Sequence, residues 1–417
     1  MGQKDAARAL KLADEAASLY RGLGDRRGEA SALRLAAHIH TSCRQWGKAV
    51  EVAQQAVGLS EVIGDSTDQA HSLRRMVEAC VAQGNLEKAV RSANDECSMY
   101  RKAGNKWEET NALLSTSAVL SSMGNFEKAV ATAAEAQALS HKIGDAKMEA
   151  KAWYAIAEGQ LSNGKHSAAL WAAERARKLS QDASDTRRVV AARLLTAQAS
   201  FAQAVQNDEK GGSEIETGKM VETALNEGAE AVDLARSLSD QELAAEALCV
   251  VAKAQAAAML WHEALLSASE AVETYHAFNH CWGEASAHVL CAHIHLLAER
   301  PGRAGKAAAE AMFLFQKCGD FQAEAWAAEA LEKATSASYR DILPSFPPPP
   351  SKAALGTRNI GTGLGLAKKL LLDESPVDYN VPLVPAGPAL GSKTSLCGAL
   401  TQQILQEHLK TSASSSA

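Results

Sequence analysis

A fixed period of 40 residues is the feature of this sequence that most restricts how it can fold. A glycine or serine followed by aspartate or asparagine returns at that spacing, and an alanine stands fifteen residues ahead of the later marks. The marks are Gly24-Asp25, Gly64-Asp65, Gly104-Asn105, Gly144-Asp145 and Ser184-Asp185, and the alanines are Ala49, Ala89, Ala129 and Ala169. Such a period is typical of stacked structural repeats.

Each repeat is predicted to form two helices, which we call its leading helix and its trailing helix. The apolar residues follow helical spacing, whereas glycine, asparagine and aspartate collect at the joints. In the first repeat one stripe of the leading helix holds Ala30, Leu33, Ala37 and His40, and one stripe of the trailing helix holds Ala49, Val52, Ala56 and Leu59. The chain is therefore expected to be all-α.

Two kinds of turn separate the predicted helices. The turn inside a repeat is marked by Trp46-Gly47, Gly84-Asn85, Gly124-Asn125 and Gly164-Lys165, where glycine can adopt the positive φ that ends a helix. The turn between repeats supplies Asp25, Asp65 or Asp145 as the expected N-cap of the next leading helix.

Two columns of side chains recur along the trailing helices, and together they predict how the repeats pack. Small residues let two backbones approach, and large apolar residues fill the space to the next repeat. The small column is Ala16, Ala56, Glu96, Ala136, Ala176, Ala231, Ala271 and Ala311, and the large column is Leu19, Leu59, Met99, Leu139, Leu179, Leu234, Thr274 and Leu314. Because one repeat cannot bury its apolar face alone, neighbours must stack into a solenoid.

These residues resemble the tetratricopeptide repeats, in particular the 40-residue variety of Pins-type spindle-orientation adaptors and kinesin light chains. The resemblance rests on the Gly-Asp joint, on Glu29-Ala30 and Glu149-Ala150, and on Gly-Asn-Phe-Glu-Lys-Ala from Gly124 to Ala129, which residues 84–89 echo. It covers residues 1 to about 336. It implies a right-handed α-solenoid, whose function the fold alone does not specify.

The predicted array spans residues 1–336, with about seven helix pairs and a lone helix at each end. Regular pairs are expected at about 26–63, 66–103, 106–143 and 146–183. A 15-residue insertion at about 206–218 separates the helices of the fifth pair. Residues 337–417 are rich in proline, glycine and serine and are expected to be largely disordered.

Composition narrows the class of protein. The formal net charge of −6 argues against nucleic acid as a partner. The eight cysteines include no Cys-x-x-Cys pair, which is typical of reduced thiols in an intracellular protein. No apolar run has the length of a signal peptide or of a membrane span. A cytoplasmic protein without a membrane span is the expectation.

The resemblance implies that the leading helices line a concave groove and carry the ligand contacts. Basic residues occupy the implied positions in the first two repeats, and apolar residues occupy them in the third to fifth. A peptide or helix of a partner protein could bind there, with its acidic residues at Arg34 and Arg74. The alternative is that these side chains pack between turns of the array. The predicted groove residues are Arg34, His38, Arg74, Leu114, Tyr154, Glu158, Leu161, Leu194, Gln198 and Phe201.

Catalytic and metal-binding motifs are scarce. No nucleophile elbow, Walker loop or acid pair is found, so no catalytic residue or cofactor is predicted. Ala-His-Ile-His occurs twice, with His38 and His40 in one copy and His293 and His295 in the other. Residues two apart on a helix point in different directions, so structural roles are expected and no metal is predicted. His38 and His293 are expected on the groove side.

The predicted function is that of a non-enzymatic adaptor binding a partner segment in the groove. The alternative is a structural subunit or assembly factor of a larger complex, bound through convex or edge surfaces.

One short motif in the tail suggests a second partner. Ser345 precedes Phe346, Pro347, Pro348, Pro349 and Pro350, and this run is similar to the phenylalanine-polyproline ligands of EVH1 domains. A phenylalanine that anchors a preformed polyproline helix is a sound docking element. The alternative is a stiff spacer.

Overall fold

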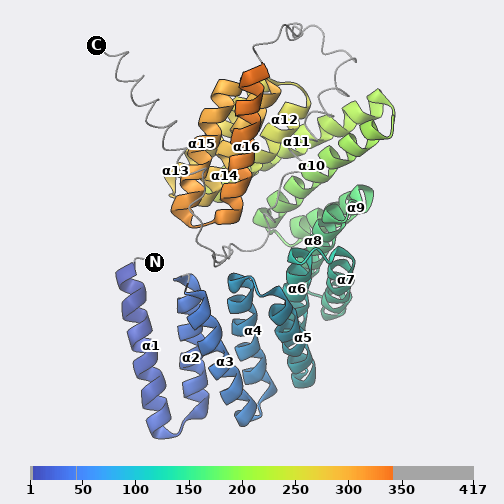
Figure 1. Ribbon diagram of the computed structural model, residues 1–417. Helices are drawn as coiled ribbons and strands as arrows, with labels where there is room; N and C mark the ends of the chain where they lie inside the picture. The colour runs from blue at the N-terminus through green and yellow to red at the C-terminus, as the bar shows by residue number, and fades with distance from the viewer. Residues whose placement is uncertain (1–2, 44, 341–417) are drawn as a thin grey trace, which may run out of the picture. The chain divides into compact units, whose positions relative to one another are not determined.

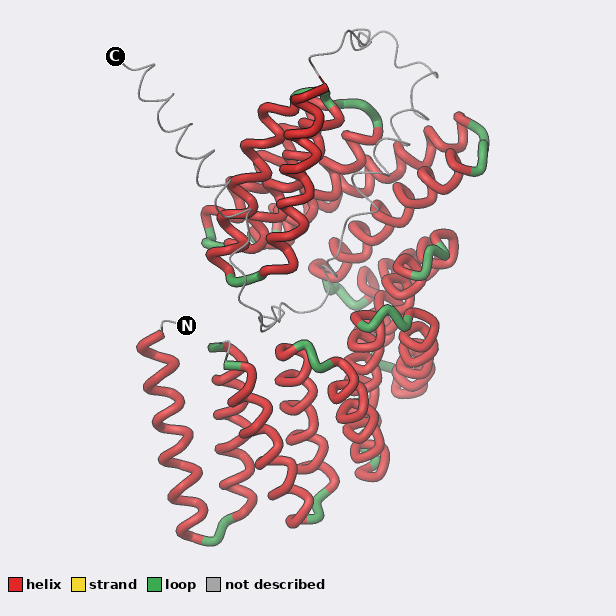
Figure 2. Tube along the Cα trace, viewed as in Figure 1, coloured by secondary structure: helices red, strands yellow, loops and turns green. Residues whose placement is uncertain are grey.

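The computed structural model describes residues 3–43 and 45–340. In this part of the chain there are sixteen helices and no strand (Figures 1 and 2). The prediction of an all-α solenoid is confirmed. None of the described helices combines the length and the apolar character that crossing a bilayer requires.

The described chain divides into two units. The first contains residues 3–203 and Asn226–Leu238, and the second contains Ala204–Leu225 and residues 239–340. The boundary falls within the helices α10 and α11. The first unit begins with α1 (Gln3–Leu23), α2 (Arg26–Ser42), α3 (Trp46–Ile63), α4 (Ser66–Gln83), α5 (Leu86–Ala103), α6 (Lys106–Ser122), α7 (Phe126–Ile143), α8 (Ala146–Ser162) and α9 (His166–Asp182). Across the boundary and beyond follow α10 (Thr186–Glu209), α11 (Glu214–Ser237), α12 (Gln241–Ala257), α13 (Trp261–Ala277), α14 (Cys281–Leu297), α15 (Pro301–Cys318) and α16 (Phe321–Arg340).

The turns between the early repeats follow the prediction. Gly24 and Gly64 have φ values of 73° and 76°, in the left-handed region that favours glycine. The carboxylates of Asp25, Asp65 and Asp145 each accept a hydrogen bond from a backbone N–H in the first turn of the helix that follows. These side chains therefore satisfy donors that a helix start leaves free.

One predicted turn lies elsewhere. α3 begins at Trp46, so Gly47 stands in its first turn and does not end a helix. The predicted glycine turns at Gly84, Gly124 and Gly164 are all found with positive φ.

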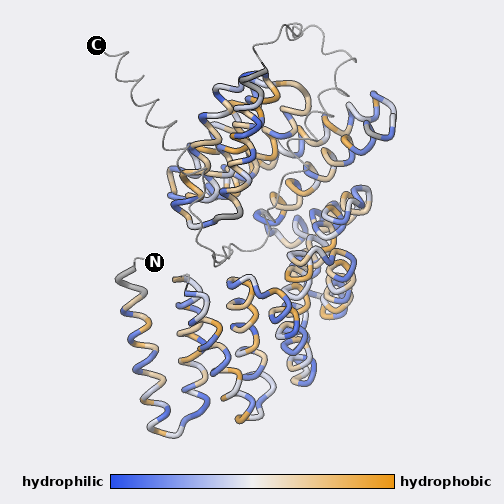
Figure 3. Tube along the Cα trace, in the orientation of Figure 1, coloured by the Kyte–Doolittle hydropathy of each residue, from blue (hydrophilic) through white to orange (hydrophobic). Residues whose placement is uncertain are grey.

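The small column, together with the alanines that stand fifteen residues before the repeat marks, forms the seam of the array. Ala49, Ala89, Ala129 and Ala169 are fully buried, as are Ala56 and Ala136 on the same helices. The large column lies beside this seam, with Leu59 and Leu139 half-buried against clusters of buried residues. Apolar and polar segments alternate along the helices accordingly (Figure 3).

The extra residues of the fifth pair lengthen both of its helices. α10 and α11 have 24 residues each, whereas α2 and α9 have 17 each. Only residues 210–213 remain as the turn between them. The Asn207 amide donates to Thr217 Oγ1 over 2.9 Å near the end of this hairpin.

Candidate functional site

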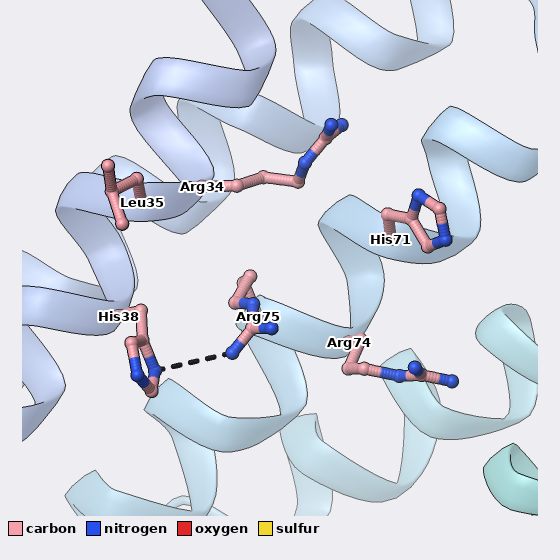
Figure 4. A pocket seen from close by; sticks show the side chains of 6 residues that line it. All are labelled: Arg34, Leu35, His38, His71, Arg74 and Arg75. Atoms are coloured by element: carbon pink, nitrogen blue, oxygen red, sulfur yellow. Dashed lines mark hydrogen bonds between the residues drawn. The ribbon is translucent and has the colours of Figure 1, made fainter. Parts of the chain in front are cut away.

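A cavity of about 370 Å³ lies between α2 and α4 in the first unit (Figure 4). We call its lining the basic pocket, because it contains three arginines and two histidines and no acidic residue. The lining residues are Arg34, Leu35 and His38 from α2, and His71, Arg74 and Arg75 from α4. Positions three or four apart share a helix face, and the 40-residue period places Arg34 and Arg74 at equivalent positions.

Arg74 is held by carboxylates of the chain itself. Its Nε donates to Glu96 Oε1 over 2.8 Å, and its Nη2 donates to Glu108 Oε2 over 2.7 Å. Its guanidinium also lies 5.3 Å from the centre of the Tyr100 ring. Arg74 is therefore a fixed wall of the basic pocket and is less available to a partner than the sequence predicts.

Arg34 and Arg75 are less fully engaged. Arg34 Nη2 donates to Ser31 Oγ over 2.8 Å and its Nη1 donates to Ser72 Oγ over 3.5 Å, while a carboxylate oxygen of Asp68 lies 3.8 Å from that Nη1. Arg75 Nη1 donates to Glu78 Oε2 over 2.6 Å and lies 3.2 Å from His38 Nδ1 (Figure 4). A guanidinium carries five N–H donors, so both arginines retain donors for an anion.

His71 is a neutral member of the basic pocket near neutral pH. Burial lowers the pKa of its imidazole, and the positive charges of Arg34 and Arg74 lower that pKa further. Its ring meets the Tyr100 ring edge-on, with 6.0 Å between the centres. The Tyr100 ring thus contacts both His71 and Arg74.

Glu96 is the residue that sequence reasoning missed. It is fully buried, and burial raises the pKa of its carboxyl to about 7, although the positive charge of Arg74 acts to lower that pKa. Its Oε2 and the Tyr100 hydroxyl are both buried without a hydrogen-bond partner. The sequence contained a signal for Glu96, because it is an acidic residue in a column otherwise filled by alanine. A buried charge in such a column requires a partner.

The apolar residues predicted for the groove divide into two groups. Leu114, Tyr154 and Leu161 are half-buried on α6 and α8 and pack against clusters of core residues. Leu194 and Phe201 are only 3% and 4% exposed, so the prediction that they line an open groove is wrong. α10 buries apolar side chains on more than one face, as a helix packed on several sides does.

The two remaining polar residues of the predicted groove, Glu158 and Gln198, are half-buried. The structure brings together Arg34, His38 and Arg74, and it adds Leu35, His71 and Arg75 to them.

The histidine pairs are not equivalent. His38 lines the basic pocket, whereas His293 of the second unit is 2% exposed, so the prediction that it faces the groove is wrong. The His293 ring lies 6.1 Å from the Trp326 ring of α16, and burial lowers the pKa of the imidazole to about 3. Within residues 3–43 and 45–340, no three His, Cys, Asp or Glu side chains form a group that could hold a metal ion.

The tail motif of Phe346 and Pro347 to Pro350 lies outside the described residues, and its EVH1 partner stays a prediction.

No family model matches the sequence. No curated protein matches it either. Solved structures with a similar fold include a STAND signal-transduction ATPase with a tetratricopeptide repeat sensor from Pyrococcus horikoshii. It is 19% identical, with a TM-score of 0.48, and the match covers 60% of this chain and 37% of that one.

For two further similar structures, the match covers a larger share of both chains. Aspartyl phosphate phosphatase F from Bacillus subtilis is 13% identical, with a TM-score of 0.45, over 88% of this chain and 97% of that one. A Rap protein in complex with competence and sporulation factor is 12% identical, with a TM-score of 0.43, over 82% and 89%. The described helices of this chain follow one another in pairs, with a 40-residue step from α2 to α10 and again from α12 to α16.

Proposed function

We propose that this chain is a non-enzymatic adaptor that binds a segment of another protein along its leading helices α2, α4, α6 and α8. The observation that carries the proposal is the basic pocket, whose lining holds three arginines and no acid. Arg34 and Arg75 retain N–H donors at its surface, and charge-assisted bonds from guanidinium to carboxylate are strong. Acidic side chains of the partner are therefore the expected contacts.

Apolar side chains on the leading helices extend the proposed surface. Leu35 lies in its lining and is 54% exposed. Leu114, Tyr154 and Leu161 are half-buried and offer part of their surface on α6 and α8. A partner segment that combines acidic and apolar residues would match both kinds of contact.

Selection from a random peptide library against the full chain tests this proposal. We expect the selected peptides to be enriched in acidic and apolar residues, and Arg75→Glu to weaken their binding at least tenfold. Arg91→Glu on α5 is the matched control, because Arg91 is exposed and lies outside the lining of the basic pocket, and it should bind as the wild type does. Selected peptides that bind Arg75→Glu and wild type equally would contradict the proposal.

A specific observation also favours the second candidate function, a structural subunit bound through another face. Trp171 on α9 is 55% exposed. Its ring meets Trp153 at 5.0 Å, and the Arg175 guanidinium lies 5.5 Å from its centre. Exposed tryptophan and arginine are frequent in the energetic centres of protein interfaces. If Trp171→Ala abolishes association with the native partner and Arg75→Glu leaves it intact, this second function is the correct one.

A further inference from the structure

A buried carboxyl group binds Arg74, one of the residues that line the basic pocket. Glu96 of α5 occupies the position that Ala56 and Ala136 occupy in the neighbouring repeats, and all three residues are fully buried. A carboxylate has to be paired in such a place, because the interior does not solvate it. The polar surroundings of Glu96 therefore decide whether it carries a charge.

These surroundings satisfy the carboxylate only in part. Oε1 accepts the bond from Arg74 Nε, while Oε2 is buried without a partner. The charged and titratable groups that face it are Arg74 and Glu78 from α4, Glu108 from α6, and Tyr100 on its own helix. The two acids disfavour its charge, and burial does so more strongly, which raises its pKa to about 7.

Arg74 connects this carboxyl group to the cavity. It lines the basic pocket and at the same time binds Glu96 and Glu108. When Glu96 is ionised, the two carboxylates together outweigh the charge of Arg74. When Glu96 takes a proton, Glu108 alone opposes that charge. The potential that Arg74 contributes to the pocket therefore depends on the proton of Glu96.

We propose that the basic pocket binds an acidic side chain of a partner segment and that this binding drives uptake of one proton from the solvent by Glu96. The inference rests on the proposed function and adds the chemistry of one subsite. Arg34 and Arg75 donate to the ligand carboxylate, and Glu96 acts through Arg74 as a positioning residue without touching the ligand. A cavity of about 370 Å³ is at the small end of ligand sites and suits one or two side chains.

The direction of the pH effect follows from thermodynamic linkage. The ligand's negative charge disfavours the ionised form of Glu96, so binding raises the affinity of Glu96 for a proton. Reciprocally, a proton on Glu96 raises the affinity for the ligand. Uptake of one proton changes affinity by at most about tenfold per pH unit. Because Glu96 already holds its proton below about pH 7, only the range above that pH contributes, and affinity should rise by about tenfold between pH 8 and pH 6.

A fluorescein-labelled nonapeptide of alternating glutamate and leucine, titrated with the full chain at pH 6, 7 and 8, tests the inference. The wild type should bind about tenfold more tightly at pH 6 than at pH 8. Glu96→Gln should bind at pH 8 about as the wild type does at pH 6 and should lose most of the slope with pH. Glu96→Ala, which introduces the residue of the neighbouring repeats, gives the same test if the glutamine variant folds poorly.

Two matched controls separate Glu96 from its neighbours. Glu108→Gln removes the other carboxylate on Arg74 and should keep a dependence on pH that Glu96→Gln loses, displaced to lower pH because Glu108 no longer raises the pKa of Glu96. His71→Asn removes an imidazole of the lining that burial and the arginines keep neutral, and it should also keep most of the wild-type slope with pH. Calorimetry in buffers of different ionisation enthalpy should show proton uptake by the wild type that Glu96→Gln loses.

The failures of the two proposals differ. Binding that Arg75→Glu weakens, with the same pH profile in the wild type and Glu96→Gln, overturns the proton-linked subsite and leaves the adaptor function standing. Absence of peptide binding at all three pH values contradicts both.

Discussion

The indole Nε1 of Trp107 donates a hydrogen bond of 3.2 Å to Oδ2 of Asp145, the residue that caps α8. Asp145 Oδ1 accepts from the backbone N–H of Met148 in the same helix, so one carboxylate ties consecutive leading helices together. The bond recurs in the second unit, where Trp282 Nε1 donates to Asp320 Oδ2 over 3.2 Å. In both places the partners are 38 residues apart, and the bond fixes the stacking of two repeats.

Asp145→Ala should therefore destabilise the protein more than loss of an ordinary cap. It removes the cap on α8 and the bond from Trp107, and we expect a loss of about 2 kcal/mol in the free energy of unfolding. Asn105→Ala is the control, because Asn105 caps α6 through Glu108 N, and it should cost about 1 kcal/mol. Equal losses in urea unfolding would show that the Trp107 bond contributes nothing.

Gly283→Ala should destabilise the second unit because an aromatic ring occupies the space beside Gly283. A Cβ at this position would lie 2.5 Å from Tyr275 Cδ1 and from His280 Nδ1. Overpacking of this kind costs about 1–3 kcal/mol. Gly302→Ala is the matched control, since its Cβ would meet nothing within 4 Å.

Thermal unfolding checks the Gly283 prediction. A lower melting temperature for Gly283→Ala, with Gly302→Ala at or above the wild-type value, is the expected result. An unchanged melting temperature for Gly283→Ala would mean that Tyr275 and His280 move aside without cost.

Ser184→Gly should stabilise the chain. Ser184 adopts φ 55°, at a position where the earlier repeats carry Gly24, Gly64, Gly104 and Gly144. Left-handed backbone costs a residue with a Cβ about 1 kcal/mol, and glycine avoids that cost. Ala183→Gly provides the comparison in urea unfolding, because Ala183 has φ −82° and gains nothing from glycine. A loss of stability in Ser184→Gly would contradict the proposed strain.

Glu96 should make stability depend on pH in an unusual direction for an acid. Its pKa rises on folding from the ordinary 4.5 to about 7, so the folded state holds the proton over a range in which the unfolded state has lost it. Stability should therefore be greatest below pH 4.5 as far as Glu96 is concerned, and should fall as pH rises to about 7. The fall is at most about 3 kcal/mol.

Comparison of the wild type with Glu96→Gln isolates this contribution. The difference in unfolding free energy between the two proteins should change by up to about 3 kcal/mol between pH 4.5 and pH 7.5, and Glu96→Gln should be the relatively more stable protein at the higher pH. A difference that stays constant over that range would mean that Glu96 titrates at its ordinary pKa.

The helices and the composition of the seam could be predicted because both depend on local chemistry. Gly64 ends α3 and Asp65 caps α4 through contacts within a few residues. Burial of Ala56 and Ala136 follows from the column that they share. The period of that column can be recognised without knowing which helix covers it.

The candidate site could be predicted only in outline. The resemblance to tetratricopeptide repeats indicated Arg34, His38 and Arg74, which do line one cavity. It did not indicate that Glu96 and Glu108 hold Arg74, because those residues lie 22 and 34 positions away on other helices. Leu194 and Phe201 looked suited to a groove, yet both are buried.

The sequence by itself determined where most of the helices begin and end and which residues form the repeated seam, since turn geometry and helical spacing act over fewer than ten residues. Only the tertiary structure decided which charged groups line the basic pocket and which of them are paired with other residues of the chain. The difference has a physical cause: the charge state of Glu96 and the freedom of Arg74 depend on burial and pairing between helices, and no local pattern encodes those distances.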